Sequence, residues 1–121
     1  MHILIVEDND INAAVLTHFL IPYGHPVHRV VNGQQAVDYV LKHPVGLIMM
    51  DINMPIMDGH EATKQIRAET SIVQPPIIAV TADVTMASEK KCTEVGMNGF
   101  LSKPLNAQKL ATEVEQYLVK K

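Results

Sequence analysis

The stretch VGLIMMDINMPIMDGHEATKQIR, residues 45–67, contains a strand, a loop and a helix start in that order. Residues 45–50 form a short and nearly continuous apolar run, which is typical of a strand buried on both faces of a parallel sheet. Asp51 follows the run directly, and Asp58-Gly59 is a helix start signal. The stretch therefore predicts a buried strand that ends at a carboxylate and leads into a helix.

The same unit recurs along the chain. Four further apolar runs lie at residues 2–6, 27–31, 76–80 and 99–101. The segments between them have helical spacing, with apolar stripes formed by Ile11, Val15 and Phe19, by Ala36, Val37, Val40 and Leu41, and by Ala107, Leu110, Ala111, Val114, Tyr117 and Leu118. Strands that alternate with helices predict an α/β fold: a flavodoxin-like (βα)5 doubly wound parallel sheet with strand order 2-1-3-4-5.

Local signals refine two of the helices. Asn32-Gly33 begins the second helix, and Asn106 is a good N-cap for the last one. Residues 84–95 are rich in Thr, Ser, Glu and Lys and have a poor apolar stripe, so we expect a helix that packs only loosely on the sheet.

Length and composition limit the class of protein. With 121 residues, 47% of them hydrophobic and 19% charged, the chain is expected to be one folded domain, residues 1–121, with no output domain. Its apolar runs are far shorter than the roughly 20 residues of a spanning helix, so no membrane insertion is expected. A single cysteine, Cys92, excludes an internal disulfide and suits a reducing cytoplasm, the expected location. The net charge of −3 argues against direct nucleic-acid binding.

Polar side chains follow the predicted strands. Glu7 and Asp8 follow the first run, Asp51 the third, Thr81 the fourth and Lys103 the fifth. Sites in open α/β sheets form at the carboxyl ends of the strands, so these groups are expected to meet. Two carboxylates about 5 Å apart repel by roughly 3 kcal/mol at an effective dielectric near 20. Positive charge must therefore join the acids: Lys103 supplies one charge, and Mg²⁺ or Mn²⁺, which prefer oxygen ligands, would supply two more.

Such a site favours phosphoryl transfer to a carboxylate. A partly neutralised acidic cluster leaves one carboxylate able to act as a nucleophile. Asp51 is the best candidate because it ends the central strand, between the acid pair and Lys103. The metal, Lys103 and the Thr81 hydroxyl suit the peripheral oxygens of a phosphoryl transition state. Each residue alone would more often be a helix cap, a turn former or a surface lysine, so the prediction depends on the whole set.

Four motifs carry a resemblance to a known family: ILIVEDN at 3–9, MDINMPIMDGHEATKQIR at 50–67, IIAVTAD at 77–83 and GFLSKPL at 99–105. Over essentially its whole length the chain resembles the receiver domains of bacterial response regulators and hybrid histidine kinases. The second motif is most similar to the hybrid-kinase kind. The resemblance implies a signalling phosphoacceptor of a two-component system or phosphorelay rather than an enzyme.

The resemblance also implies roles for the acids. Asp51 matches the phosphoacceptor. Glu7 and Asp8 match the acid pair that holds Mg²⁺ with Asp51, and the backbone carbonyl of Asn53 matches a further ligand. Glu7 stands where many relatives have Asp, and its longer side chain is expected to reach the metal still, directly or through water. The Asn53 side chain is expected to modulate the site.

The remaining residues match positions of these receiver domains that respond to phosphorylation. Thr81 matches the switch hydroxyl, and Phe100 matches the switch aromatic, which must act by packing alone because it lacks a hydroxyl. Lys103 matches the lysine that pairs with a phosphoryl oxygen, and its bond to Pro104 is expected to be cis. Asp83 is expected to alter the phosphoryl lifetime. The fourth helix, fifth strand and fifth helix would carry the change outward.

The implied partner is a histidine kinase or a histidine phosphotransfer protein, and a weak dimer is compatible with the same sequence. The main alternative is a receiver-like docking module that is never phosphorylated, and a phosphorylation assay separates the two. A phosphatase of the haloacid-dehalogenase type would want a second acid at residue 53, where this chain has Asn. A nucleotide-binding flavodoxin-like module would need a glycine-rich or hydroxyl-rich loop where this chain has EDND.

Overall fold

The computed structural model describes residues 2–82 and 85–118 and confirms the predicted fold class. Five parallel strands form one sheet in the order β2-β1-β3-β4-β5. The strands are β1 (His2–Val6), β2 (Val27–Val30), β3 (Val45–Asp51), β4 (Ile77–Thr81) and β5 (Gly99–Ser102). The helices are α1 (Asp10–Leu20), α2 (Gly33–Lys42), α3 (Gly59–Ala68), α4 (Met86–Val95) and α5 (Ala107–Val114), with the short 3-10 helix η1 (Ile21–Tyr23) after α1. None of the helices in these two described ranges is long and apolar enough to cross a membrane.

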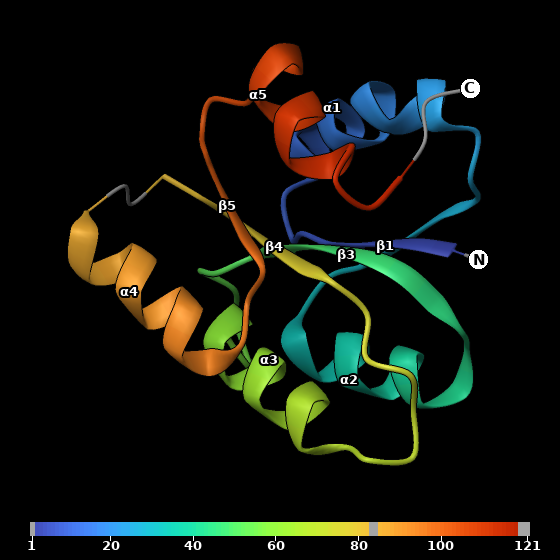
Figure 1. Ribbon diagram of the computed structural model, residues 1–121, viewed down its shortest axis with the longest axis vertical. Coiled ribbons are helices and arrows are strands. Elements are labelled where there is room, and N and C mark those ends of the chain that lie inside the picture. The colour runs from blue at the N-terminus through green and yellow to red at the C-terminus, as the bar shows by residue number, and fades with distance from the viewer. Residues whose placement is uncertain (1, 83–84, 119–121) are drawn as a thin grey trace.

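The sheet separates two layers of helices. α1 and α5 cover one face, and α2, α3 and α4 cover the other (Figure 1). Successive strand residues such as Ile48 and Met49 point into opposite layers. Every residue of β4 is buried, as expected for a central strand covered on both faces. This double coverage explains why the strands read as continuous apolar runs.

The strand ends differ slightly from the predicted ones. β2 stops at Val30 because the N–H of Val31 donates to the side chain of Gln35 at 3.0 Å. β3 runs one residue further than predicted and includes Asp51, and β4 is shifted by one residue and includes Thr81. Both polar residues are therefore part of the sheet rather than of the loops that follow it.

Side-chain caps begin the helices at the predicted positions. Asn32, Asp58 and Asn106 each accept a hydrogen bond from the backbone N–H three residues on, at 2.8, 2.9 and 2.9 Å. Asn9 and Thr85 cap α1 and α4 in the same way. The cap at Asn9 starts α1 immediately after the acid pair.

The apolar stripe of α1 is a helical face, but it lies largely on the outside. Ile11 is 74% exposed and Val15 is 37% exposed. The residues that α1 buries against the sheet are Ala13, Leu16 and Leu20. Because α1 is apolar on more than one side, periodicity alone does not reveal which stripe packs inward. An apolar face is therefore left on the surface, beside the end of β1.

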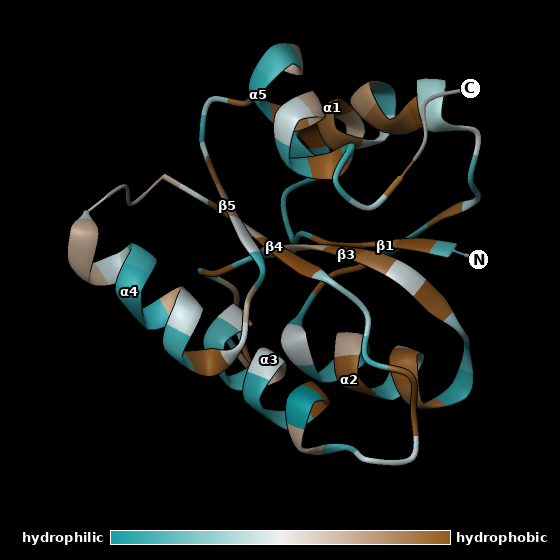
Figure 2. Cartoon of the chain, viewed as in Figure 1, coloured by the Kyte–Doolittle hydropathy of each residue, from teal (hydrophilic) through white to brown (hydrophobic). Residues whose placement is uncertain are grey.

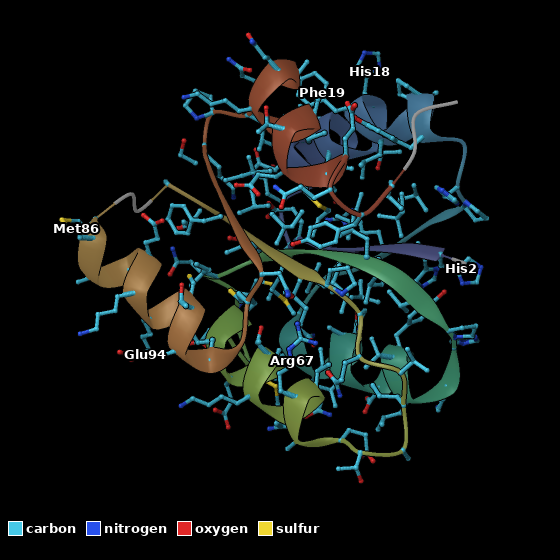
Figure 3. All side chains as sticks on the ribbon, viewed as in Figure 1. His2, His18, Phe19, Arg67, Met86 and Glu94 are labelled. Atoms are coloured by element: carbon cyan, nitrogen blue, oxygen red, sulfur yellow. The ribbon has the colours of Figure 1, made fainter. Side chains whose placement is uncertain are left out.

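α4 packs loosely, in agreement with its composition. It buries only Cys92 and Val95 among the described residues, and hydrophilic residues predominate along it (Figure 2). Met86, in its first turn, is 88% exposed and points away from the sheet (Figure 3). Little apolar area therefore holds α4 in its place.

Candidate functional site

The carboxyl ends of the strands bring the predicted acids and ammonium to one edge of the sheet. Glu7 and Asp8 follow β1, Asp51 ends β3, and Lys103 follows β5. Carboxylate oxygens of the three acids lie within 4.8 Å of one another. The backbone N–H of Lys103 donates to the carbonyl of Thr81 at 2.8 Å, which fixes the start of the last loop against β4.

Lys103 joins two of the three acids. Its Nζ lies 3.1 Å from Glu7 Oε1 and 3.6 Å from Asp51 Oδ1. Glu7 is 1% exposed and Asp51 is 5% exposed, whereas Asp8 is exposed. Buried carboxylates require paired charge, and three acids beside one ammonium leave negative charge in excess. The arrangement therefore favours binding of a further cation.

The pKa of the Asp51 carboxyl is raised to about 6, chiefly by burial and next by the neighbouring Glu7 carboxylate. The Lys103 ammonium and the N–H of Asn53 act in the opposite direction. The ionised form of Asp51 is thus held at a higher free energy than in water. Perturbed carboxyl groups of this kind concentrate at functional sites.

Backbone contacts fix the positions of both buried acids. The N–H of Asn9 donates to Glu7 Oε2 at 3.2 Å, and the N–H of Asn53 donates to Asp51 Oδ1 at 3.3 Å. Gly59 packs directly beneath Asp51, because a Cβ at this glycine would lie 2.5 Å from the Asp51 carbonyl oxygen. The loop after β3 can therefore return into α3 this closely only with glycine at residue 59.

The remaining predicted residues lie around this cluster. Thr81 is 1% exposed at the end of β4, and Phe100 is half-buried in β5, against the apolar cluster on the α4 side of the sheet. The peptide bond between Lys103 and Pro104 is cis. Asp83 lies outside the described residues.

The donor set fits a hard divalent cation. Glu7, Asp8 and Asp51 offer only oxygen ligands, and no histidine or cysteine of the described ranges joins the group. Oxygen ligands with excess negative charge suit Mg²⁺ or Mn²⁺, whereas Zn²⁺ is mostly bound through nitrogen and sulfur. Asn53 is exposed in the loop that follows Asp51.

Two residues near the site were not foreseen from the sequence. Ile56 has a φ of 70° and is 84% exposed. The N–H of Met57 donates to the carbonyl of Pro55 at 2.8 Å, so that Ile56 is the central residue of a three-residue turn. Such a γ-turn is rare for a β-branched residue, and the preceding proline was its only sequence signal. Arg29 of β2 donates to the carbonyl of Glu7 at 3.0 Å, and its signal was a charged residue within an apolar strand run.

Comparison with known sequences identifies relatives over nearly the whole chain. The family model of the response regulator receiver domain matches residues 3–115. Probable histidine kinase 4 of Oryza sativa subsp. japonica is 37% identical over 138 residues. That alignment covers 97% of this chain but 14% of the kinase, so the chain spans about a seventh of the length of this relative.

Solved structures of receiver domains share the fold. The receiver domain of the sensor histidine kinase PA1611 from Pseudomonas aeruginosa has a TM-score of 0.86 and 35% identity, covers 96% of this chain and 95% of its own, and has a magnesium ion coordinated in its active-site cleft. The co-crystal structure of the Saccharomyces cerevisiae histidine phosphotransfer protein Ypd1 with the receiver domain of its downstream response regulator Ssk1 gives a TM-score of 0.86 and 33% identity. That match covers 97% of this chain and 88% of the other.

Proposed function

This chain belongs to the response regulator receiver domain family of two-component and phosphorelay signalling, and from that premise we propose that Asp51 accepts a phosphoryl group from a phosphohistidine. In this proposal residues 1–121 act as one receiver domain. The observation that carries it is a buried carboxylate, 3.6 Å from the Lys103 ammonium, whose pKa is raised by burial and by Glu7. Burial of such a carboxylate costs free energy, and groups with shifted pKa values concentrate at functional sites, which counts against a module used for docking alone.

The transfer is a displacement at phosphorus. A carboxylate oxygen of Asp51 attacks the phosphorus atom of the phosphohistidine. The new O–P bond forms as the P–N bond breaks, and the released imidazole takes a proton from solvent. Lys103, already beside Asp51, and the Thr81 hydroxyl at the end of β4 would donate to the peripheral phosphoryl oxygens.

Mg²⁺ is the proposed cofactor, and Mn²⁺ is expected to replace it. The side chains of Glu7, Asp8 and Asp51 would hold the ion together with the backbone carbonyl of Asn53. When bound, the ion supplies positive charge that offsets the excess negative charge of the acids and of the phosphoryl group. Lys103 then pairs with a phosphoryl oxygen.

The phosphoryl group would be removed from Asp51 by one of two routes. Water attacks phosphorus and releases inorganic phosphate, which regenerates the carboxylate, or the group passes to another histidine. The exposed Asn53 side chain and Asp83 are proposed to set the lifetime of the acyl phosphate. The protein thus assists its own phosphorylation and dephosphorylation.

Phosphorylation is proposed to switch the surface formed by α4, β5 and α5. New negative charge on Asp51 would attract Thr81 and Lys103, and Phe100 would fill the space that Thr81 leaves. α4 can follow because, within the described part of the chain, it buries only Cys92 and Val95. The outcome would be a population shift between two packings of this surface.

The exposed face of α1 is the proposed docking site for the phosphodonor protein. Ile11, Val15 and Phe19 lie on one side of α1, and His18 points away from the sheet (Figure 3). This face begins just after the acid pair, and a partner that brings a phosphohistidine to Asp51 must cover the same edge. Exposed apolar patches of this kind mark interaction surfaces. We assign the partner as a histidine phosphotransfer domain or a kinase.

Ile11→Ser is expected to slow phosphoryl transfer from a protein donor while leaving transfer from acetyl phosphate unchanged. A minority of interface residues cost more than about 1 kcal/mol when truncated, and Ile11, which is more exposed than Val15 on this face, is expected to be one of them; that cost corresponds to roughly fivefold in rate. Because Ile11 is 74% exposed, stability is expected to change by less than about 0.5 kcal/mol. Transfer of labelled phosphate from phosphorylated Ypd1, used as the probe, measures the effect.

The matched control is Val73→Ser. Val73 is 94% exposed but precedes β4, at the opposite edge of the sheet, so this variant is expected to behave as wild type with both donors. Equal transfer rates for Ile11→Ser and wild type would contradict docking on α1.

Incubation with acetyl phosphate and Mg²⁺ tests the proposed function directly. Mass spectrometry of the intact protein is expected to show the addition of one phosphoryl group. EDTA should abolish the increment because the acids would then lack their cation, and excess Mn²⁺ should restore it. A protein that gains no phosphoryl group with either metal present would be the docking module instead.

A further inference from the structure

Arg29 connects β2 to the acidic segment that follows β1. Its Nε donates to the backbone carbonyl of Glu7 at 3.0 Å, and its Nη1 donates to Asp10 Oδ1 at 2.7 Å. The Arg29 side chain is 30% exposed, and its Nη2 atom is buried with no hydrogen-bond partner among the described residues. Arg29 therefore holds both ends of a short segment that carries Asp8 between them.

The Glu7 carboxylate is held by contacts other than those of Arg29. Lys103 Nζ lies 3.1 Å from Glu7 Oε1, and the N–H of Asn9 donates to Glu7 Oε2 at 3.2 Å. Arg29 thus fixes the backbone of Glu7, while Lys103 and Asn9 fix its carboxylate. From β2, the carbonyl of Val30 also accepts a hydrogen bond from the N–H of Glu7 at 3.1 Å, and Arg29 adds side-chain contacts to the Glu7 carbonyl and to Asp10.

We infer that Arg29 is a positioning residue for the cation site: it fixes the backbone of residues 7–10 so that Glu7 and Asp8 present their oxygens to one divalent ion. The inference rests on the proposed Mg²⁺ site. Groups that orient metal ligands without touching the metal typically contribute roughly 10–100-fold to metal affinity. Arg29 contacts the backbone of one ligand and the residue that begins α1, which is the geometry such a role requires.

Two other roles for Arg29 make different predictions. A guanidinium that acts only through its charge repels the cation, so its removal would strengthen Mg²⁺ binding. An ordinary surface ion pair with Asp10, whose side chain is 92% exposed, would leave Mg²⁺ affinity unchanged. Positioning alone predicts weaker binding. The direction of the change therefore separates the three roles.

Mg²⁺ titrations of wild type, Arg29→Gln and Arg29→Lys test the inference, with the NMR shifts of the backbone amides of residues 7–9 as the readout. Arg29→Gln removes the charge, whereas Arg29→Lys keeps the charge but not the planar fork that reaches two acceptors. Both variants are expected to bind Mg²⁺ roughly tenfold more weakly than wild type. Lys42→Gln makes the same charge change at the end of α2, before β3 begins, and is expected to bind like wild type.

Phosphorylation kinetics give a second readout. The Mg²⁺ concentration that half-saturates the reaction with acetyl phosphate is expected to rise by about the same factor in both Arg29 variants. The rate at saturating Mg²⁺ is expected to stay within about twofold of wild type, because Arg29 touches no reacting atom. A general loss of structure would lower the saturated rate as well.

The outcomes separate this inference from the proposed function. Unchanged or tighter Mg²⁺ binding by folded Arg29→Gln would overturn the positioning role and leave the metal site in place. Failure of wild type to bind Mg²⁺ would instead refute the proposed site. Circular dichroism establishes folding, and if Arg29→Gln does not fold, Arg29→Lys decides the question alone.

Discussion

Asp51→Asn is expected to eliminate phosphorylation by acetyl phosphate and, at the same time, to raise the free energy of unfolding of the metal-free protein. Asparagine has nearly the same shape as aspartate, but its amide is not a nucleophile toward phosphorus. The substitution also removes a carboxylate that is 5% exposed and lies beside Glu7. Loss of function together with a gain of stability cannot result from misfolding.

The gain in stability has a defined pH dependence. The pKa of Asp51 is about 6 in the folded protein, against about 3.9 for an unperturbed aspartate. Between pH values of about 4 and 6, the folded protein keeps the Asp51 proton whereas the unfolded chain loses it. The contribution of Asp51 to stability is therefore fully present below about pH 4 and is lost as the pH rises through about 6. The advantage of Asp51→Asn is therefore expected to reach roughly 3 kcal/mol above about pH 7 and to vanish near pH 4.

Urea unfolding in EDTA across this pH range measures the difference between the two proteins. Asp38→Asn is the matched control, because Asp38 is exposed on α2 and its replacement is expected to have little effect. Saturating Mg²⁺ should narrow the difference, since a cation that binds the folded state stabilises wild type. A phosphoryl increment that persists in Asp51→Asn would place the acceptor elsewhere.

Gly59→Ala is expected to lower the free energy of unfolding by about 2–3 kcal/mol. A Cβ at residue 59 would lie 2.5 Å from the Asp51 carbonyl oxygen and 2.9 Å from the Ile52 Cα, and neither backbone atom can move without shifting β3. Helix propensity alone predicts the opposite sign, a gain of up to about 1 kcal/mol. The shift would also displace the Asp51 side chain, so slower phosphorylation is expected as well.

Gly99→Ala provides the control for Gly59→Ala. A Cβ at residue 99 would lie 2.9 Å from Glu113 Oε2, the far end of a flexible side chain that can turn away, and 3.3 Å from Ile78 Cγ1, but it would meet no backbone atom this closely. Its effect on stability is therefore expected to be much smaller. Urea unfolding measures the stability of both variants, provided that the dependence of the free energy of unfolding on urea concentration is unchanged. Equal stabilities of the two variants would contradict a backbone clash at Gly59.

Much of the fold follows from the sequence because the strands are buried on both faces. Such strands read as apolar runs, and the caps at Asn32, Asp58 and Asn106 are local signals that need no knowledge of the rest of the chain. The outer position of Ile11 and Val15 could not be read in the same way. Several sides of α1 are apolar, and the choice of the packed side depends on the shape of the sheet beneath it.

The candidate site was predictable to the extent that strand ends converge. Glu7, Asp51 and Lys103 each stand at the end of a strand, so the strand order alone brings them to one edge. The raised pKa of Asp51 depends on its burial, and the hydrogen bond between Arg29 and the Glu7 carbonyl depends on the pairing of β1 with β2. Both are properties of the folded chain rather than of any local pattern.

The Lys103 side chain connects the end of β5 with the end of β1. It follows β5, yet its ammonium reaches Glu7 after β1, across the ends of β4 and β3. A doubly charged group on Asp51 would compete with Glu7 for that one ammonium. If Lys103 turned toward the new anion, the ammonium that now lies 3.1 Å from Glu7 Oε1 would be withdrawn from that buried carboxylate, so phosphorylation at the end of β3 would also change the charge balance at the end of β1.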